Sequence, residues 1–467
     1  MNKDSKIIPL FPEESLLDVR ALAFQETELG KLHAIIPWEA LSNLLPAPKS
    51  SYSCGAKPWF TNAGKFACMF LKHYTNLSDE KLIDRINTDW AMQEFCGIRL
   101  GINQRIKDKE IIGRIRGQLS VHLEQLPQFQ KELANEWFKH VKQESLKQVS
   151  ADASCYESYL RYPTDVKLLW ECVEWLYDKQ LFPICNQLKI NRPRNKFREQ
   201  SRKQLSFAKK KKKTAQETKV RLRALLLLTN KGKKQLEELL KNPLALDYFS
   251  LKDLHTFMIV SKVIEQQQYM FDNNVRSVEN RIVSIFKDYV RPIVRGKENK
   301  SVEFGMKTHK IQIAGISFIE YNSFDAYNES TRLVSTLLLH EELTGIKCER
   351  AAFDQIYATN ANRKILTQKK IKTNFSKKGR AKKNQSQKEK EKERKVKQEL
   401  AKERATVLEG SFGNEKNHYG LRKIKARSAE TEQVWVFFGI MTANAVKVMK
   451  LKNKRTKQIE EPPRKVA

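Results

Sequence analysis

The chain has 467 residues, of which 87 are Lys or Arg and 54 are Asp or Glu, giving a formal net charge of +33 and a pI near 9.7. This basic excess is typical of proteins with a polyanion partner, nucleic acid first and an anionic membrane surface second. Seven scattered cysteines without a CxxC pair argue against a zinc site. The N-terminus does not resemble a signal peptide, and the longest apolar stretch, Val434 to Val446, is too short to span a bilayer. We therefore expect a soluble, cytoplasmic, nucleoid-associated protein without a membrane partner.

Residues 1–145 carry the apolar period of packed helices, with Phe66, Met69 and Phe70 on one predicted face. Asn76 and Ser78 are candidate N-caps for a helix that begins near Asp79. We interpret this part as an all-helical N-terminal DNA-binding domain. Many helical subdomains of this size only pack against their neighbours, so that alternative stays open.

Residues 146–193 change to a β-prone run and then a helix, and form the predicted first strand and helix of a core. The β-prone run is predicted to end on an acidic residue, Asp152, with the small residues Ala151 and Ala153 on either side. Residues 194–298 then form a strongly basic helical insertion that includes the lysine run 209–213. A lysine run is either a solvated face or a phosphate contact, and in a chain this basic both are open.

Residues 299–449 are predicted to complete the core. Val302 to Ile313 and Ile316 to Tyr321 form a hairpin signal, and a helix and a short strand ending on Asp354 follow. A lysine-rich segment, 372–404, leads into a helix with Glu409 on its first turns. The remaining residues, 450–467, are charged and contain prolines, so we expect a disordered basic tail.

With the insertion removed, the element order is β-β-β-α-β-α-α, which is that of a ribonuclease-H-like mixed sheet. The predicted fold is therefore α/β, a ribonuclease-H-like mixed sheet with a large helical insertion after the first strand. Such a fold brings the end of the first strand beside the end of the fourth, so Asp152, Asp354 and Glu409 could meet. Three carboxylates suit a site for two Mg²⁺ ions, which favour oxygen ligands. Taken singly, each acid is also explained as a turn, cap or exposed helix residue.

Four ordered stretches carry a resemblance to a known family. They are LSDEKLIDRINTDWAMQEFCGI (Leu77 to Ile98), DASCYESYLRYPTDVKLLWE (Asp152 to Glu171), VEFGMKTHKIQIAGISFIEYNSFDAYNE (Val302 to Glu329) with FDQIYATNANR (Phe353 to Arg363), and LEGSFGNEKNHYGLRKIKARSAETEQVWVFFGIMTAN (Leu408 to Asn444). With these motifs the chain resembles the DDE transposases of bacterial insertion sequences, in the superfamily of insertion-sequence groups four and five.

The resemblance implies a ribonuclease-H-like core that performs cut-and-paste DNA strand transfer. It places the catalytic and metal-binding acids on Asp152, on Asp354 in a D-x-I-Y context, and on Glu409 in an E-G-x-F-G context. It implies two Mg²⁺ ions, for which Mn²⁺ can substitute. Lys416, seven positions after the glutamate, would face a DNA phosphate.

The chain departs from the family at two positions. The family often has an arginine four residues before the glutamate and a tyrosine three residues before that arginine. Here these positions are Ala405 and Lys402, and Arg404 lies one step off, about 100° round an α-helix. Arg404 and Lys307 are candidate DNA-phosphate contacts. His309 could also line the site, but a polar strand residue is the simpler interpretation.

The leading hypothesis is a transposase that binds the terminal inverted repeats of its own element through its N-terminal helices and basic insertion. The three acids would support hydrolysis and transesterification of DNA phosphodiesters. Because two ends must be held together, we expect a homodimer on double-stranded DNA. A structure-specific or defensive nuclease of the same fold would use the same acids, and an inactive DNA-binding descendant of a transposase is a further alternative.

Overall fold

The computed structural model describes residues 13–46, 58–101, 103–297, 300–376, 378 and 386–460. Contacts divide the chain into two compact units. The first unit comprises the described residues of Met1–Glu157, Met306–Ser323 and Tyr327–Ala467, and the second those of Ser158–Gly305 and Phe324–Ala326. The finer domain boundaries drawn from the sequence stay predictions.

The first unit begins with helices, as the 3.6-residue apolar period predicts. They are α1 (Glu13–Glu26), α2 (Glu28–His33), α3 (Trp38–Asn43), α4 (Asn62–Thr75), α5 (Asp79–Thr88), α6 (Trp90–Phe95), α7 (Ile111–Ser120) and α8 (Leu126–Trp137). Ser78 caps α5 by accepting a hydrogen bond from the Lys81 amide. Asn76 is not an N-cap: it ends α4 in the left-handed region, with φ 52°.

A mixed six-stranded sheet follows in the chain. Its strands are β1 (Gln148–Glu157), β2 (Pro292–Lys297), β3 (Lys300–Ile313), β4 (Ile316–Ser323), β5 (Arg350–Phe353) and β6 (Lys372–Thr373). The strand order is β2-β3-β1-β5-β6, and β4 also pairs with β3. β1 and β5 are parallel, as are β5 and β6, while β3 and β4 form an antiparallel hairpin.

The hairpin turn lies at Ala314 and Gly315, whose φ angles of 50° and 79° are both positive. Two consecutive residues with positive φ suit a tight hairpin turn, because its twist matches the twist of the strands. The sequence-predicted hairpin is therefore confirmed, with β4 extending to Ser323.

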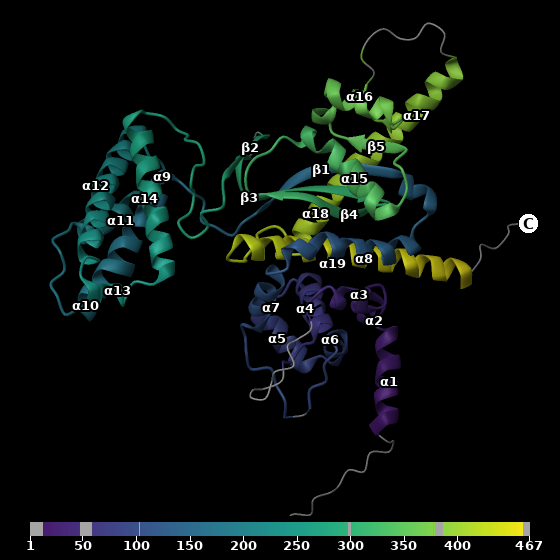
Figure 1. The fold of residues 1–467 in the computed structure, drawn as a ribbon, viewed down its shortest axis with the longest axis horizontal. Helices are drawn as coiled ribbons and strands as arrows, with labels where there is room; N and C mark the ends of the chain where they lie inside the picture. The colour runs from purple at the N-terminus through teal and green to yellow at the C-terminus, as the bar shows by residue number, and fades with distance from the viewer. Residues whose placement is uncertain are drawn as a thin grey trace, which may run out of the picture. The chain divides into compact units, whose positions relative to one another are not determined.

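The remaining α-helices of this unit, together with one π-helical segment, come after the hairpin. They are α15 (Leu333–Thr344), α16 (Asn360–Gln368), α17 (Gln387–Glu403), a π-helical segment (Arg404–Leu408), α18 (Glu409–His418) and α19 (Ala429–Glu460). Figure 1 shows α19 running along the sheet beside α8, with α4 and α7 against it. The rings of Phe66 in α4 and Phe438 in α19 lie 5.9 Å apart. The N-terminal helices thus share a core with the C-terminal helix.

α19 differs from the sequence prediction at its end. Residues 450–460 continue the helix, whereas the sequence predicted a disordered tail; residues 461–467 lie outside the described residues. Ala429–Arg455 is long and apolar enough to cross a membrane, but 78% of its most apolar window is buried inside the protein. Burial against the sheet and the N-terminal helices explains its apolar character.

The second unit contains the helical insertion. Its helical elements are α9 (Asp165–Glu174), a π-helical segment (Trp175–Leu181), α10 (Phe182–Gln187), α11 (Phe197–Lys209), α12 (Ala215–Leu239), α13 (Pro243–Leu246) and α14 (Leu251–Asp272). Their apolar faces form a continuous core around Leu169, Leu225 and Val260. Gly232 of α12 packs closely on Tyr177, because an added Cβ would lie 2.8 Å from the tyrosine ring. The second unit therefore has a core of its own, which the insertion shares with α9.

Candidate active site

The pairing of β1 with β5 brings the first two predicted acids together. Ala151 of β1 lies opposite Phe353 of β5 in the parallel register. Asp152 and Asp354 are the next residues along the chain, so they also lie side by side. Asp354 directly follows β5, whereas Asp152 lies within β1 and not at its end. The side chain of Asp152 is 17% exposed and that of Asp354 is 48% exposed.

A single guanidinium joins all three predicted acids. Arg404 Nη1 lies 3.0 Å from Asp152 Oδ2 and 2.9 Å from Glu409 Oε1. Arg404 Nη2 lies 3.2 Å from Asp354 Oδ1. The structure therefore gathers carboxylates from residues 152, 354 and 409 around one cation, and it adds Arg404 to the group.

The π-helical segment explains why Arg404 reaches this position. In a π-turn the backbone hydrogen bond joins residues five apart, so each turn holds one more residue than an α-helical turn. Arg404 is five residues before Glu409, and the segment Arg404–Leu408 accommodates the extra residue. The sequence expectation that Arg404 points about 100° away assumed an α-helix and is wrong for this reason.

The face of β1 that carries Asp152 meets the C-terminal helices at two further points. Ser154 and Tyr156 follow at alternate positions, which share one face of a strand. Lys416 Nζ donates to Ser154 Oγ over 2.8 Å and lies 5.5 Å from the centre of the Tyr156 ring. The Tyr156 hydroxyl bonds to the Glu415 carboxylate. These contacts align α18 with β1, so Lys416 lies beside the acids.

Sequence reasoning missed a buried ion pair beneath α18. Lys310 of β3 is fully buried, and its ammonium lies 2.5 Å from Glu415 Oε1 and 2.7 Å from Ser411 Oγ. Burial lowers the pKa of Lys310, and the Glu415 carboxylate opposes that shift. No sequence signal distinguishes this lysine from the exposed lysines elsewhere in the chain, because its partner lies about a hundred residues away.

Lys307 and Glu329 form a second pair near Asp152. Lys307 Nζ lies 2.8 Å from Glu329 Oε1 and donates to the Tyr327 carbonyl over 2.9 Å, with both side chains of the ion pair only 13% exposed. Lys307 is thus held by an internal acid, and its contact with DNA phosphate stays a prediction. Glu329 ends one of the resembling stretches, but its role was not foreseen.

The charges around Asp152 shift its proton affinity. Burial raises the pKa of Asp152, and the nearby carboxylates of Glu329 and Asp354 raise it further. The Ala153 amide and the Arg404 guanidinium oppose this rise. The centre is therefore rich in negative charge, and a cation stabilises it.

His309 lies in the interior of this unit. It is fully buried; its Nε2 bonds to the Tyr357 hydroxyl, and its Nδ1 lies 2.9 Å from Glu320 Oε2. Glu320 in turn pairs with Arg332. These contacts support the simpler interpretation of His309 as a buried polar residue of the strand that lies beside an acid.

The donor atoms of the site suit a hard divalent cation. All three acids offer carboxylate oxygens, the ligands that Mg²⁺ and Mn²⁺ prefer. Within the described residues, no group of three His, Cys, Asp or Glu side chains is placed to hold a metal ion. The acids turn toward Arg404 instead, so metal binding requires this guanidinium to move aside.

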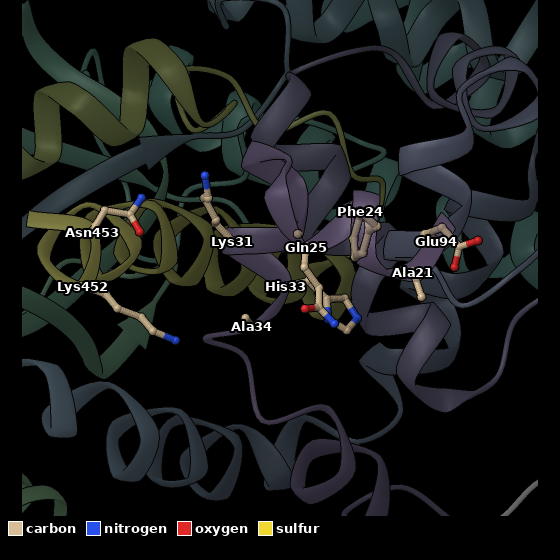
Figure 2. Close-up of a pocket in the computed structure, with 10 residues that line it drawn as sticks. Ala21, Phe24, Gln25, Lys31, His33, Ala34, Glu94, Lys452 and Asn453 are labelled. Atoms are coloured by element: carbon tan, nitrogen blue, oxygen red, sulfur yellow. The ribbon is translucent and has the colours of Figure 1, made fainter. Parts of the chain in front are cut away.

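A surface pocket lies elsewhere in the first unit. Figure 2 shows its residues, which come from α1, α2 and the ends of α6 and α19 and enclose about 410 Å³. Burial lowers the pKa of His33 at its wall to about 4, so this histidine is neutral at pH 7. The pocket contains none of the predicted acids.

Two family models match the chain. A transposase domain (DUF772) matches residues 18–118, and a transposase DDE domain matches residues 351–443. Both matched models are models of transposase domains, one in the N-terminal and one in the C-terminal part of the chain. The DDE match includes Asp354, Arg404, Glu409 and Lys416, whereas Asp152 lies outside both matched ranges. No curated protein and no solved structure matches the chain.

Proposed function

We propose that the chain is a transposase that catalyses metal-dependent DNA cleavage and strand transfer at the ends of an insertion sequence. One observation carries this proposal: carboxylates from three distant parts of the chain converge on a single guanidinium. The two transposase domain matches support it independently.

We further propose a ribonuclease-H-like core. In the sheet, β1 lies between the β3–β4 hairpin and the parallel strands β5 and β6, and the helix with Glu409 follows these strands in the chain. The contacts of β1 with Arg404, Glu415 and Lys416 lay this helical region against the acids. This arrangement supports the proposed core, although β2 and β6 are additional to the strands that the sequence predicted.

In this proposal the acidic residues bind metal ions and the basic residues bind DNA phosphate. Asp152, Asp354 and Glu409 would hold two divalent cations, which supply activation of the attacking oxygen and stabilisation of the leaving oxygen. Arg404 and Lys416 carry positive charge at the same place, so each can bind a phosphate oxygen of the substrate strand. The chain would act as a homodimer. Each copy would bind one of the two terminal repeats, which are double-stranded DNA.

The test is a cleavage and joining assay on duplexes that carry the terminal repeats, in Mg²⁺ or Mn²⁺. Asp152→Asn, Asp354→Asn and Glu409→Gln keep the shape of each side chain and remove its charge. We expect each to lower strand cleavage by on the order of 10²-fold or more while binding to the duplex persists. Glu341→Gln, at an exposed position of α15, is the matched control and should cleave normally.

Three outcomes decide the proposal. Full cleavage by any of the three variants would remove that residue from the site. Cleavage by the wild-type chain without joining would identify a nuclease and reject strand transfer. Absence of cleavage in the wild type, on its own terminal sequences, would indicate an inactive descendant.

A further inference from the structure

The charge of the helical insertion is unevenly distributed. Residues 192–234 contain seventeen Lys and Arg and two Glu, whereas residues 235–272 contain three Lys and six Asp and Glu. The basic part covers α11, the loop after it and most of α12, while the acidic part covers α13 and α14. The insertion is therefore polarised between its helices.

One exposed row of α11 concentrates this charge. Arg198, Arg202 and Lys209 lie four and seven residues apart, a spacing that places them on one face of a helix. Lys211 and Lys212 follow in the loop, and all five are exposed. We call these five residues the α11 surface.

The opposite face of α11 is fixed to α12 by a buried arginine. Arg221 of α12 is 6% exposed; its Nε donates to Gln204 Oε1 over 2.9 Å and its Nη1 to Gln200 Oε1 over 2.6 Å. Its Nη2 donates to the Gln200 carbonyl over 2.8 Å. Neutral amides hold this guanidinium, so the attachment of α11 introduces no carboxylate beside the α11 surface.

In the part of the chain that the structure describes, acidic side chains do not pair with the basic residues of the α11 surface. Lys203 and Lys210 pair with Glu199 and Glu217, the two acids of this basic stretch. Among the described residues, none of the five members of the α11 surface forms an ion pair. Five unneutralised cations on one short element repel each other, and a polyanion relieves that repulsion.

The dimensions of the row suit a nucleic-acid backbone. From Arg198 to Lys209 the helix rises about 16 Å, at 1.5 Å per residue. One strand of duplex DNA presents a phosphate about every 3.4 Å along its axis, so the row spans about five phosphates. Gln200 and Gln204, the side chains of α11 best suited to read adenine, are held by Arg221 on the buried face.

We propose that the α11 surface binds the phosphate backbone of duplex DNA without reading its sequence. This proposal rests on the proposed function and deepens it, because it assigns the insertion to DNA of any sequence, such as target DNA, and not to recognition of the terminal repeats. The contact is electrostatic, so counterion release governs its salt dependence.

The experiment compares two triple variants of the full chain by fluorescence anisotropy in EDTA, with a random-sequence duplex and a terminal-repeat duplex. The first carries Arg198→Gln, Arg202→Gln and Lys209→Gln. The matched control carries Lys241→Gln, Lys252→Gln and Lys262→Gln, at exposed positions of the acidic part. Between about 50 and 200 mM salt, we expect the first variant to lower the slope of log K against log salt by up to about 2.7 on both duplexes, and the control to leave it unchanged.

An unchanged slope in the first variant, an equal loss in the control, or a loss confined to the terminal-repeat duplex would each overturn the proposal. Weakened binding to phosphatidylserine vesicles with intact DNA binding would also overturn it, in favour of a membrane surface. Circular dichroism confirms that both variants are folded. Since the assay contains no divalent metal, failure of strand cleavage leaves its outcome unaffected.

Discussion

Arg404 sets the charge of the candidate active site at the scale of single residues. Its guanidinium offsets one of three negative charges and orients the Asp152, Asp354 and Glu409 carboxylates toward one point. A divalent cation that binds the same oxygens must compete with this guanidinium. In the proposed function, Arg404 would therefore lower metal affinity before substrate arrives and would become available to a phosphate once the metal is bound.

Replacing Arg404 by Gln should accordingly strengthen metal binding in the absence of DNA. A unit charge at about 4 Å contributes roughly 1 to 4 kcal/mol, depending on the local dielectric, so we expect Mn²⁺ affinity to rise on the order of tenfold. Electron paramagnetic resonance of free Mn²⁺ measures this directly. Arg363→Gln is the control, because Arg363 donates to the Ala358 and Ser376 carbonyls and not to the acids. Unchanged or weaker Mn²⁺ binding in Arg404→Gln would show that the guanidinium does not compete with metal.

Single residues also show where sequence reasoning succeeds and fails. The order of strands and helices predicted that Asp152, Asp354 and Glu409 come together. The predicted strand end at Asp152 was wrong, because β1 continues to Glu157. The order of elements did not predict that Lys307 pairs with Glu329 or that Lys310 is buried. A lysine looks the same in one sequence whether its partner is a phosphate, a carboxylate or water.

At the scale of elements, the π-turn before α18 is the feature that positions Arg404. The hairpin was predictable because its turn residues have a local conformational preference. The π-turn was not, since no residue type specifies it and its extra residue is stabilised by tertiary contacts of Arg404. Helix spacing alone therefore gave the wrong direction for this side chain.

The π-turn can be tested by changing its length. Deleting Ala405 would leave Arg404 four residues before Glu409, which in a regular α-turn restores the same face. We expect this deletion to retain strand cleavage within about tenfold of the wild type. Inserting one Ala after Ala405 should lower cleavage much more, because it places Arg404 six residues before Glu409 and turns its side chain away from the acids. Equal loss of cleavage in the deletion and the insertion, with both proteins folded, would contradict this account.

At the scale of the whole molecule, the first unit joins parts that are far apart in the sequence. The three acids are separated by 202 and 55 residues. α4 and α7 of the N-terminal region pack on α19, and His73 of α4 bonds to the Tyr419 carbonyl over 2.9 Å. The sequence indicated separate helical and catalytic parts, but shared packing is a tertiary property that periodicity does not reveal.

The central claim is that Asp152, Asp354 and Glu409 form one metal centre. Its most direct test is Mn²⁺ stoichiometry on the chain bound to terminal-repeat duplex, for the wild type, Asp152→Asn, Asp354→Asn, Glu409→Gln and the Glu341→Gln control. The account predicts about two Mn²⁺ per chain in the wild type and the control, and loss of binding in each of the three variants. Unaltered Mn²⁺ binding in any of these three variants would contradict it.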